Sequence, residues 1–582
     1  MSTPYVPPVA DYEFLYREAF GRDIVADASG GALSADDAVE IIAGAGEFGA
    51  SVLAPLDRAG DQVGARLEDG QVRLPEGFAD AYRALAGAGW VSATAPESAG
   101  GDGLPASVGA GLGEIWNASN AAFALCWMLG AGAIHALDAA ASDDLRETYL
   151  TKLVSGEWTG TMNLTEPEAG TDLGAIRTMA TPRDDGTYAI SGQKIFITWG
   201  DHDVADNIVH LVLARTPGAP EGAKGLSLFV APRTLVNDDG SLGERNSIET
   251  VAIEHKLGIH ASPTCVLSYE DATGYLVGEL HGGLAGMFVM MNSARVGMGH
   301  QATGISDRAL QGAADYAAGR LQGPVIDRPA GTSIAEHPDV RRILRSMSSQ
   351  VFAMRALSVY VGDLFDRADS GEDVLRMAEL FVPILKGWAS EEALRVTSDG
   401  IQVYGGMGFI EETGAAQHYR DARIVPIYEG TTAIQANDLV GRKVLRDQGA
   451  TVAALFAQID ETVAALREGR AVGEGRAVGD DTAVRIADRL SRALDASRRA
   501  TDALLGFAGS PRDAYAVSVP YLMLLGTLAG GWMHALTAVA VAVHAAPSET
   551  DAARLTEADF YSAHHLVRVH ALAETVAAGE IA

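Results

Sequence analysis

Hydrophobic positions along the 582-residue chain follow two different periods, and the change between them divides the sequence. From residue 1 to about 160, apolar side chains recur at helical spacing, as in "AAFALCWMLGAGAIHALDAA", with Gly and Pro at the breaks. Residues 161–283 instead carry short, alternating, β-branched runs such as "GTYAISGQKIFIT" and "NIVHLVLAR". The pattern predicts an N-terminal helical domain over 1–160 and an antiparallel β-sheet domain over 161–283.

Helical spacing returns after the predicted sheet, in runs such as "VRRILRSMSSQVFAMRALSVYVGDLF". We expect a helical bundle over 284–449 and a C-terminal helical extension over 450–582. The hexapeptide "EGRAVG", written twice at 468–479, interrupts the extension and predicts a Gly-rich mobile connection. The expected fold class is mostly α with an inserted antiparallel β domain.

One stretch of the extension is apolar enough to span a bilayer, because residues 514–548 contain no Asp, Glu, Lys or Arg. Pro520, Gly530 and Gly531 interrupt it, and no cluster of Lys or Arg flanks it. A buried helix pair is the preferred interpretation, and no membrane span is expected.

Charge and cysteine content narrow the possible partners. Forty-four basic against 76 acidic residues give a net charge of -32, which repels nucleic acid and anionic lipid surfaces. Cys126 and Cys265 lie in apolar runs and are expected as core residues of a protein in a reducing compartment. The first residues show no secretory signal, so we expect a cytoplasmic protein.

The stretch "RIVPIYEGTTAIQAND" places a carboxylate, Glu429, just before a predicted helix. Thr431 and Thr432 are suited to cap that helix, and apolar residues then recur until Gly449 supplies a stop signal. On this stretch alone, a solvated acidic residue favoured by the helix dipole is the simpler interpretation.

Other motifs are weak when taken singly. "LTEPEAGTDLG" offers the hydroxyls of Thr165 and Thr171 in a turn, and "KIFITWG" places Phe196 and Thr198 on one side of a strand. The glycines of "QVYGGMGF" lack the spacing of a dinucleotide-binding fingerprint, and no metal-ligand spacing is visible.

Together these motifs resemble the acyl-CoA dehydrogenase family over residues 50–449. The order is specific: "LTEPEAGTDLG", "GQKIFIT", "YAAGRLQG", "GIQVYGGMGF" and "YRDARIVPIYEGTTAIQ". The long N-terminal lead and the extension are similar to the larger bacterial branch, which includes broad-range fatty acyl-CoA and 3-methylthiopropionyl-CoA dehydrogenases.

The resemblance implies an FAD-dependent oxidoreductase that makes a trans-2-enoyl-CoA, as in fatty acid β-oxidation. Glu429 matches the base that removes the α-proton while FAD accepts the β-hydride, and the peptide N–H of Glu429 matches a donor to the thioester oxygen. Some members carry the base on another helix, at the position of Ala294, and alanine cannot act as a base.

The other site residues follow from the same resemblance. The matched FAD contacts are Thr165, Phe196, Thr198, Arg320, Gln322, Gln402, Gly406 and Thr431, and the matched substrate-side residues are Thr171, Asn292, Arg295 and Gly430. This chain departs from the usual family residues at Glu168, Asn292 and Ala433, and the added charge of Glu168 changes the expected substrate entrance.

The expected partners also come from the resemblance. FAD shared between subunits implies at least a homodimer, and electron-transfer flavoprotein is the expected acceptor. Two alternatives keep the flavin chemistry: an acyl group on a carrier protein, or an acyl-CoA oxidase that uses oxygen. A DNA-binding or adaptor relative is disfavoured, because residues 451–582 carry more acids than bases.

Overall fold

The structure is a computed structural model, and it describes residues 3–468, 481–542, 544 and 548–580. The chain forms two compact units, each built from separate stretches of sequence. Unit 1 comprises Met1–Ala50, Pro105–Ala118 and Met298–Ala582, and unit 2 comprises Ser51–Leu104 and Ser119–Gly297. The four sequence ranges expected as domains stay a prediction. The hexapeptide repeat lies outside the described residues, apart from Glu468.

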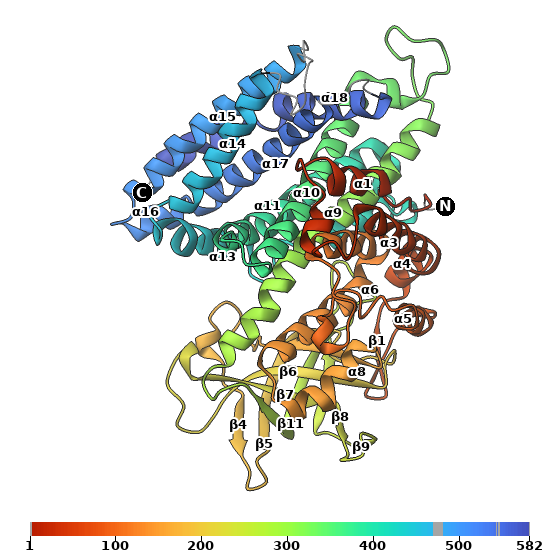
Figure 1. The fold of residues 1–582 in the computed structure, drawn as a ribbon. Coiled ribbons are helices and arrows are strands. Elements are labelled where there is room, and N and C mark those ends of the chain that lie inside the picture. Colours follow the sequence, from red (N-terminus) through yellow and green to blue (C-terminus); the bar gives the residue numbers. More distant parts are fainter. Residues whose placement is uncertain (1–2, 469–480, 543, 545–547, 581–582) are drawn as a thin grey trace. The chain divides into compact units, whose positions relative to one another are not determined.

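Unit 2 is built around a seven-stranded sheet (Figure 1). Its strands are β3 (Trp158–Asn163), β4 (Met179–Pro182), β5 (Tyr188–Thr198), β6 (Asn207–Arg215), β7 (Leu226–Pro232), β10 (Ile248–Ile253) and β11 (Thr264–Val277). The order is β10-β11-β5-β4-β6-β3, and β7 pairs with β11 and β6. The sheet is mixed rather than purely antiparallel, because β3 lies parallel to β6 at one edge.

Smaller elements complete unit 2. They are the β1–β2 hairpin (Arg66–Glu68, Gln71–Arg73), the β8–β9 hairpin (Thr234–Val236, Leu242–Arg245), α4 (Ala54–Val63), α5 (Phe78–Gly87), α7 (Asp143–Leu145) and α8 (Thr151–Val154). Two long helices cross the unit boundary: α6 (Ala106–Ala140) and α9 (Gly283–Gly319). Asn120 interrupts α6 with non-helical φ and ψ of -162° and 96°.

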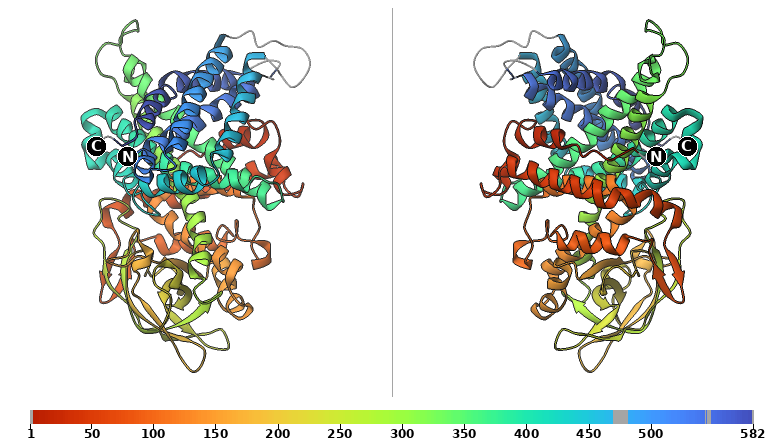
Figure 2. Two further views of the ribbon diagram at one scale, coloured as in Figure 1. Left: turned by 90° about the vertical axis from the view of Figure 1, so that its left-hand side faces the viewer. Right: turned by 90° about the vertical axis from the view of Figure 1, so that its right-hand side faces the viewer.

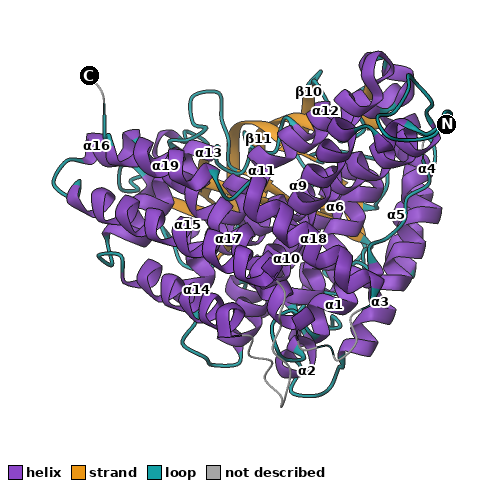
Figure 3. Cartoon of the chain, turned by 90° about the horizontal axis from the view of Figure 1, so that it is seen from above, coloured by secondary structure: helices purple, strands orange, loops and turns teal. Residues whose placement is uncertain are grey.

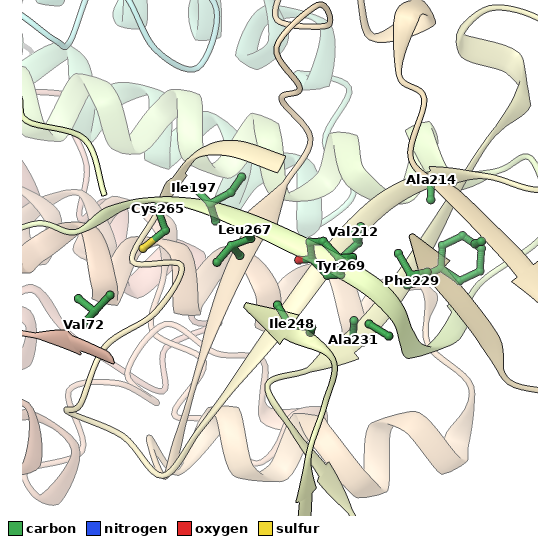
Figure 4. Close-up of a cluster of buried hydrophobic side chains, with 13 residues drawn as sticks. Val72, Ile197, Val212, Ala214, Phe229, Ala231, Ile248, Cys265, Leu267 and Tyr269 are labelled. Carbon is green, nitrogen blue, oxygen red and sulfur yellow. The ribbon is translucent and has the colours of Figure 1, made fainter. Parts of the chain in front are cut away.

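The core of the sheet gathers side chains from strands that are distant in sequence (Figure 4). Ile197, Phe229, Cys265 and Leu267 are almost fully buried there. Burial removes this apolar surface from water, which is the main force that holds the layers together. Cys265 is therefore a core residue as predicted, and Cys126 is a second buried free thiol.

Strand β5 contains a bulge just before its end. Ile197 pairs with Cys265 and Lys194 with Leu267, so β5 has one more residue than β11 between these pairs. Phe196, inside the bulge, adopts φ of +58° and is 57% exposed. A bulge re-aims the side chain that it carries, and here it presents an aromatic ring outside the core.

Unit 1 is helical. Besides parts of α6 and α9 it contains α1 (Val9–Arg17), α2 (Ile24–Ala28), α3 (Ala35–Phe48), α10 (Pro338–Asp369), α11 (Leu375–Tyr404), α12 (Ala415–Ala422), α13 (Thr432–Asp438), α14 (Ala450–Glu468), α15 (Asp481–Gly506), α16 (Pro511–Ala516), α17 (Ser518–Ala542), α18 (Glu549–His564) and α19 (Arg568–Ala577). The helices of the extension are blue in Figures 1 and 2, and three of them, α14, α17 and α18, pack on α10 or α11. The predicted order of helices, sheet and helices is confirmed.

The apolar stretch of the extension forms α17, which contacts α10, α11, α15 and α18 (Figure 3). Its predicted burial is confirmed, but it is one helix rather than a pair. Pro520 lies in the first turn, where the backbone N–H has no helical partner to lose. Gly526, Gly530 and Gly531 do not break the helix. They are glycines because Trp388, Tyr561 and Leu566 occupy the space that a side chain would need.

Three helical stretches of the described chain are long and apolar enough to cross a membrane: Ala35–Val63, Ala106–Ala140 and Ser518–Ala542. A fourth is added if the bent pair Thr432–Leu445 and Ala450–Glu468 counts as one span. This is a statement of length and composition only. The most apolar window of α17 is 89% buried within the protein.

A buried ionic cluster joins four segments of unit 1. The Arg355 guanidinium on α10 donates to Glu114 on α6 at 2.5 Å, to Asp307 on α9 at 3.1 Å and to Asp11 on α1 at 2.7 Å. Tyr12 donates a further hydrogen bond to Glu114. Burial raises the pKa of Asp307 to about 6, against the opposing effect of Arg355. One cation therefore compensates several buried carboxyl groups.

Acid is expected to weaken the sheet of unit 2. His202 and His210 bond to the hydroxyls of Thr159 and Thr161 on β3, and burial lowers the pKa of His210 to about 3 and that of His202 well below its usual value. The unfolded chain binds these protons first, so stability is full above about pH 6.5 and falls as the pH drops, by about 2 kcal/mol at pH 5 for His210.

Amide hydrogen exchange of peptides from β3 and β6, corrected for intrinsic rates and compared at about pH 7 and pH 5, measures this loss of protection. Glutamine cannot take up the proton, so in the His210→Gln variant the protection of the β3 and β6 amides is expected to depend less on pH. Equal protection of the native sheet at both values would contradict the prediction.

Candidate active site

Glu429 lies in a tight turn of unit 1, immediately before a capped helix. Thr431 is the N-cap of α13, and its side chain accepts a hydrogen bond from the N–H of Ile434, as the sequence predicts. Glu429 adopts φ of +57° and Gly430 +87°, so two successive residues are left-handed. This conformation is costly for a residue with a side chain and is often found at functional sites. The half-buried Glu429 is therefore held at the helix entrance in a strained conformation.

Side chains from α11 and α13 hold the backbone of this turn. Lys386 on α11 donates from Nζ to the carbonyls of Val425 and Gly430, at 2.8 and 2.7 Å. Gln435 on α13 donates to the carbonyl of Glu429 at 2.9 Å. The turn is also closed on itself by Thr432 N–H to Pro426 O at 3.0 Å.

Tyr428, next to Glu429, is joined to α9. Its hydroxyl donates to Oε1 of Gln301, whose buried Nε2 has no hydrogen-bond partner among the residues that the structure describes. Burial raises the pKa of Tyr428 well above its usual value, so the phenol stays neutral and keeps its proton for this bond. The residue that precedes Glu429 is thus fixed to a second helix.

A buried ion pair shapes the segment of unit 2 that contains Thr165. Lys194 on β5 is completely buried, and its Nζ donates to Leu164 O at 2.9 Å and to Glu166 Oε1 at 2.8 Å. Glu166 also accepts from the backbone N–H groups of Arg177 and Thr178. Burial lowers the pKa of Lys194 to about 8, although Glu166 opposes that shift. The pair therefore ties the Thr165 segment to β5.

The residues of unit 2 that the resemblance assigns to the flavin lie near the end of β5. Ile195 N–H donates to Thr165 O at 2.9 Å, which places Thr165 beside the bulge. Ile197 is buried in the sheet core, whereas Phe196 is exposed and Thr198 half-buried on either side of it. That Phe196 and Thr198 share a side of the strand stays a prediction, because the bulge at Phe196 interrupts the alternation on which it rests.

The remaining predicted residues of unit 2 lie on α9 and in the loop after β3. Asn292 and Arg295 lie one turn apart on α9, with 3.5 Å between Asn292 Oδ1 and Arg295 Nη1. Thr171 is exposed in the loop after β3. Glu168, the charged departure in that loop, forms an ion pair with Arg177 at 2.5 Å.

The ends of two helices of unit 1 and the segments that follow them hold the last predicted residues. Tyr316 on α9 stacks on Tyr404 on α11, at 4.3 Å between ring centroids, so the two helix ends lie together. Gln402 is exposed in the last turn of α11, and the segments after the two helices expose the predicted residues Arg320, Gln322 and Gly406. They also expose apolar side chains: Leu321, Ile326, Met407, Phe409 and Ile410.

Two of the groups that shape these segments were not predicted from the sequence. Lys386 is a single lysine within the apolar run "LFVPILKGWAS", and Lys194 occupies a buried position of a strand. A lysine in an otherwise buried pattern was the available signal, because such a group must find partners inside the fold. Among the described residues, no cluster of His, Cys, Asp or Glu is arranged to hold a metal ion.

The chain belongs to the acyl-CoA dehydrogenase family. Models of its N-terminal domain match residues 38–157, of its middle domain 161–272 and of its C-terminal domain 281–444. A model described as acetyl-CoA dehydrogenase C-terminal like matches residues 455–582, which form the extension. The family is FAD-dependent.

Among its relatives is a 3-methylmercaptopropionyl-CoA dehydrogenase from Ruegeria pomeroyi, 49% identical over 92% of this chain and 91% of that protein. A broad-specificity linear acyl-CoA dehydrogenase, FadE5 of Mycobacterium tuberculosis, is 36% identical over 81% and 79% of the two chains. The crystal structure of an acyl-CoA dehydrogenase complexed with FAD from Bacillus anthracis has the same fold, with a TM-score of 0.76 and 21% identity over 94% of this chain and 89% of that one.

Proposed function

We propose that this protein catalyses the α,β-dehydrogenation of an acyl-CoA thioester, with Glu429 as the base that removes the α-proton. The Cα–H bond loses its proton to the Glu429 carboxylate, the Cβ–H bond loses a hydride, and a trans C=C bond forms between these carbons. When bound, FAD supplies the two-electron acceptor for that hydride. The observation that carries the proposal is the braced, left-handed turn that holds Glu429 at the entrance of α13.

The residues of unit 2 fit a planar flavin ring. The exposed ring of Phe196 on the β-bulge offers an aromatic face on which a planar ligand can stack. The hydroxyls of Thr165 and Thr198 offer donors beside it. We therefore assign these three residues to the flavin ring, and Thr431 to a further FAD contact. Thr171, Asn292, Arg295 and Gly430 are assigned to the substrate.

We propose a linear acyl chain, with or without a thioether, because the two relatives are named for linear acyl-CoA and for 3-methylmercaptopropionyl-CoA. Pentanoyl-CoA and 3-methylmercaptopropionyl-CoA differ only by a methylene in place of sulfur, so comparing them isolates the heteroatom. The enolate that forms at the thioester needs nearby hydrogen-bond donors, and the peptide N–H of Glu429 is proposed as one of them.

A second copy of the chain is proposed to share the cofactor. The loops after α9 and α11 expose apolar side chains beside Arg320, Gln322, Gln402 and Gly406, and large exposed apolar residues mark interaction surfaces. Arg320 is suited to a pyrophosphate, since its planar fork binds two oxygens. Sedimentation analysis of the FAD-loaded protein tests the homodimer, and a monomer that retains FAD would exclude a shared site.

Electron-transfer flavoprotein is the proposed electron acceptor, and β-oxidation in the cytoplasm is the proposed setting. The two buried free thiols support a reducing compartment. Peroxide formation in air, without any protein acceptor, would instead favour an acyl-CoA oxidase.

The experiment that tests the proposed function is anaerobic titration of the FAD-loaded protein with a panel of acyl-CoAs, followed by bleaching of the visible flavin absorbance. Rapid bleaching by one class of chain, with the enoyl-CoA product identified by mass spectrometry, is expected. If only acyl groups on a carrier protein bleach the flavin, the proposed substrate is an acyl-carrier protein rather than an acyl-CoA. If neither kind of substrate bleaches the flavin, the proposed reaction is excluded.

Removal of the Lys194 ammonium is expected to weaken FAD binding. Lys194→Met leaves Glu166 buried without its cation, which typically costs about 3–5 kcal/mol, and frees the segment that contains Thr165. We expect the dissociation constant of FAD to rise at least about 10-fold, because the segment must be ordered again on binding. Fluorescence of released FAD during dilution measures the change.

Lys152→Met is the matched control for this variant. Lys152 pairs with Glu157 on the surface of the same unit, and such pairs contribute about 1 kcal/mol or less. If Lys194→Met binds FAD as tightly as the control, the ion pair contributes to the stability of the fold but not to FAD binding. Lys194→Met with Glu166→Leu removes both charges and is expected to recover part of the lost stability.

A further inference from the structure

The turn that contains Glu429 has an unusual support: a lysine that is entirely inside the protein. Lys386 is 0% exposed, and two hydrogen bonds from its Nζ reach the carbonyls of residues 425 and 430, on either side of Glu429. Burying an ammonium costs several kcal/mol unless its hydrogen bonds are well formed. The buried ammonium on α11 therefore has an unfavourable desolvation free energy, and two of its hydrogen bonds go to the backbone of the turn.

The turn itself needs such support. Left-handed backbone at a residue with a Cβ costs about 1–2 kcal/mol, and Glu429 and Gly430 are both left-handed. Charge-assisted hydrogen bonds are roughly twice as strong as neutral ones. Lys386 provides two of them, one before and one after Glu429, whereas Gln435 and Thr432 N–H provide neutral bonds. The lysine thus fixes both ends of the segment that contains the base.

The hydrogen bonds from Lys386 to the turn have a direct consequence for Glu429. Rotation of the peptide units on either side would move both the carboxylate and the peptide N–H of residue 429. Displacement of a catalytic group by about 1 Å is enough to lower a rate by about 100-fold. Lys386 prevents that rotation because its ammonium is anchored on α11, which spans Leu375–Tyr404.

We propose that Lys386 is the positioning residue for the base Glu429, and that its ammonium bonds to Val425 and Gly430 fix the orientation of the carboxylate and of the Glu429 N–H. This inference rests on the proposed function. It predicts that loss of the ammonium lowers the rate of proton removal while substrate binding and FAD content change little, because the two ammonium bonds go to backbone carbonyls of the turn.

The test uses the full-length, FAD-loaded protein and three variants: Lys386→Met, Lys386→Gln and the control Lys443→Met. Lys443 lies on the segment after Glu429. Like Lys386 it links this part of the chain to α11, because it pairs with Glu379 of α11 at 2.5 Å, but it is partly exposed. Stopped-flow bleaching gives the maximum rate and the half-saturating acyl-CoA concentration separately. An acyl-CoA with sulfur in place of the β-carbon has α-protons but no β-hydride, so its α-exchange with deuterium in D2O reports the base alone.

For Lys386→Met we expect the maximum bleaching rate and the α-exchange rate to fall together, by about 10- to 100-fold, with the half-saturating concentration within about 3-fold of the native value. Lys386→Gln keeps a neutral donor and is expected to lie between Met and native. If Lys386→Met does not fold with FAD, Lys386→Gln decides the comparison.

Native α-exchange in a folded Lys386 variant would overturn the inference. A rise in half-saturating concentration with an unchanged maximum rate would also overturn it, since that pattern belongs to substrate binding. Glu429→Gln separates this failure from failure of the proposed function: if it too exchanges at the native rate, Glu429 is not the base.

Discussion

Glu429→Gln is expected to abolish reduction of the bound flavin by acyl-CoA. Glutamine has nearly the same shape and keeps the backbone of the turn, but it cannot accept the α-proton. A positioned general base contributes about 100- to 10,000-fold, so we expect the bleaching rate to fall by at least about 1,000-fold. Anaerobic stopped-flow absorbance with saturating acyl-CoA measures the rate, and the flavin-to-protein absorbance ratio shows whether FAD is still bound.

The control is Glu379→Gln, which removes a carboxylate from α11 in the same unit. Glu379 is 44% exposed and pairs with Lys443, so its loss is expected to change the rate by less than about 3-fold. A Glu429→Gln protein that keeps FAD and bleaches at more than a tenth of the native rate would assign the base to another group.

Arg355→Met is expected to produce the largest loss of stability among single substitutions in unit 1. The change leaves Glu114 and Asp307 buried without their cation, and breaking a buried ion pair from one side costs about 3–5 kcal/mol. It also removes one of the two arginine contacts of Asp11, which joins α1 to the cluster, and leaves Arg554 as the other. Urea unfolding followed by circular dichroism measures the shift in midpoint.

Arg342→Met on the same helix is the matched control. Arg342 pairs with Asp339 at the surface, 2.9 Å apart, and its loss is expected to cost less than about 1 kcal/mol. Equal midpoints for Arg355→Met and Arg342→Met would show that the buried cluster contributes no net stability. The stability difference between Arg355→Met and the native protein is also expected to shrink at low pH, where the buried Asp307 carboxyl becomes neutral.

The order of helices, sheet and helices could be predicted because it depends on local periodicity. Alternation in "GTYAISGQKIFIT" and helical spacing on both sides of the sheet are properties of neighbouring residues. The parallel pairing of β3 with β6 could not be predicted in this way, since pairing depends on which strands meet after a crossover. For the same reason the single helix α17 was expected as two: its glycines look like breaks until Trp388, Tyr561 and Leu566 fill the space beside them.

The sequence by itself determined the helix entrance at Glu429, because capping by Thr431 and the spacing after it are local. It also pointed to Thr165, Phe196 and Thr198 through the resemblance. Only the tertiary structure decided what holds these groups. Lys194 lies 28 residues from Glu166, and Lys386 lies 39 and 44 residues from the carbonyls that it binds. A buried cation takes its partners from whatever the fold brings within reach, and no local pattern in the chain specifies them.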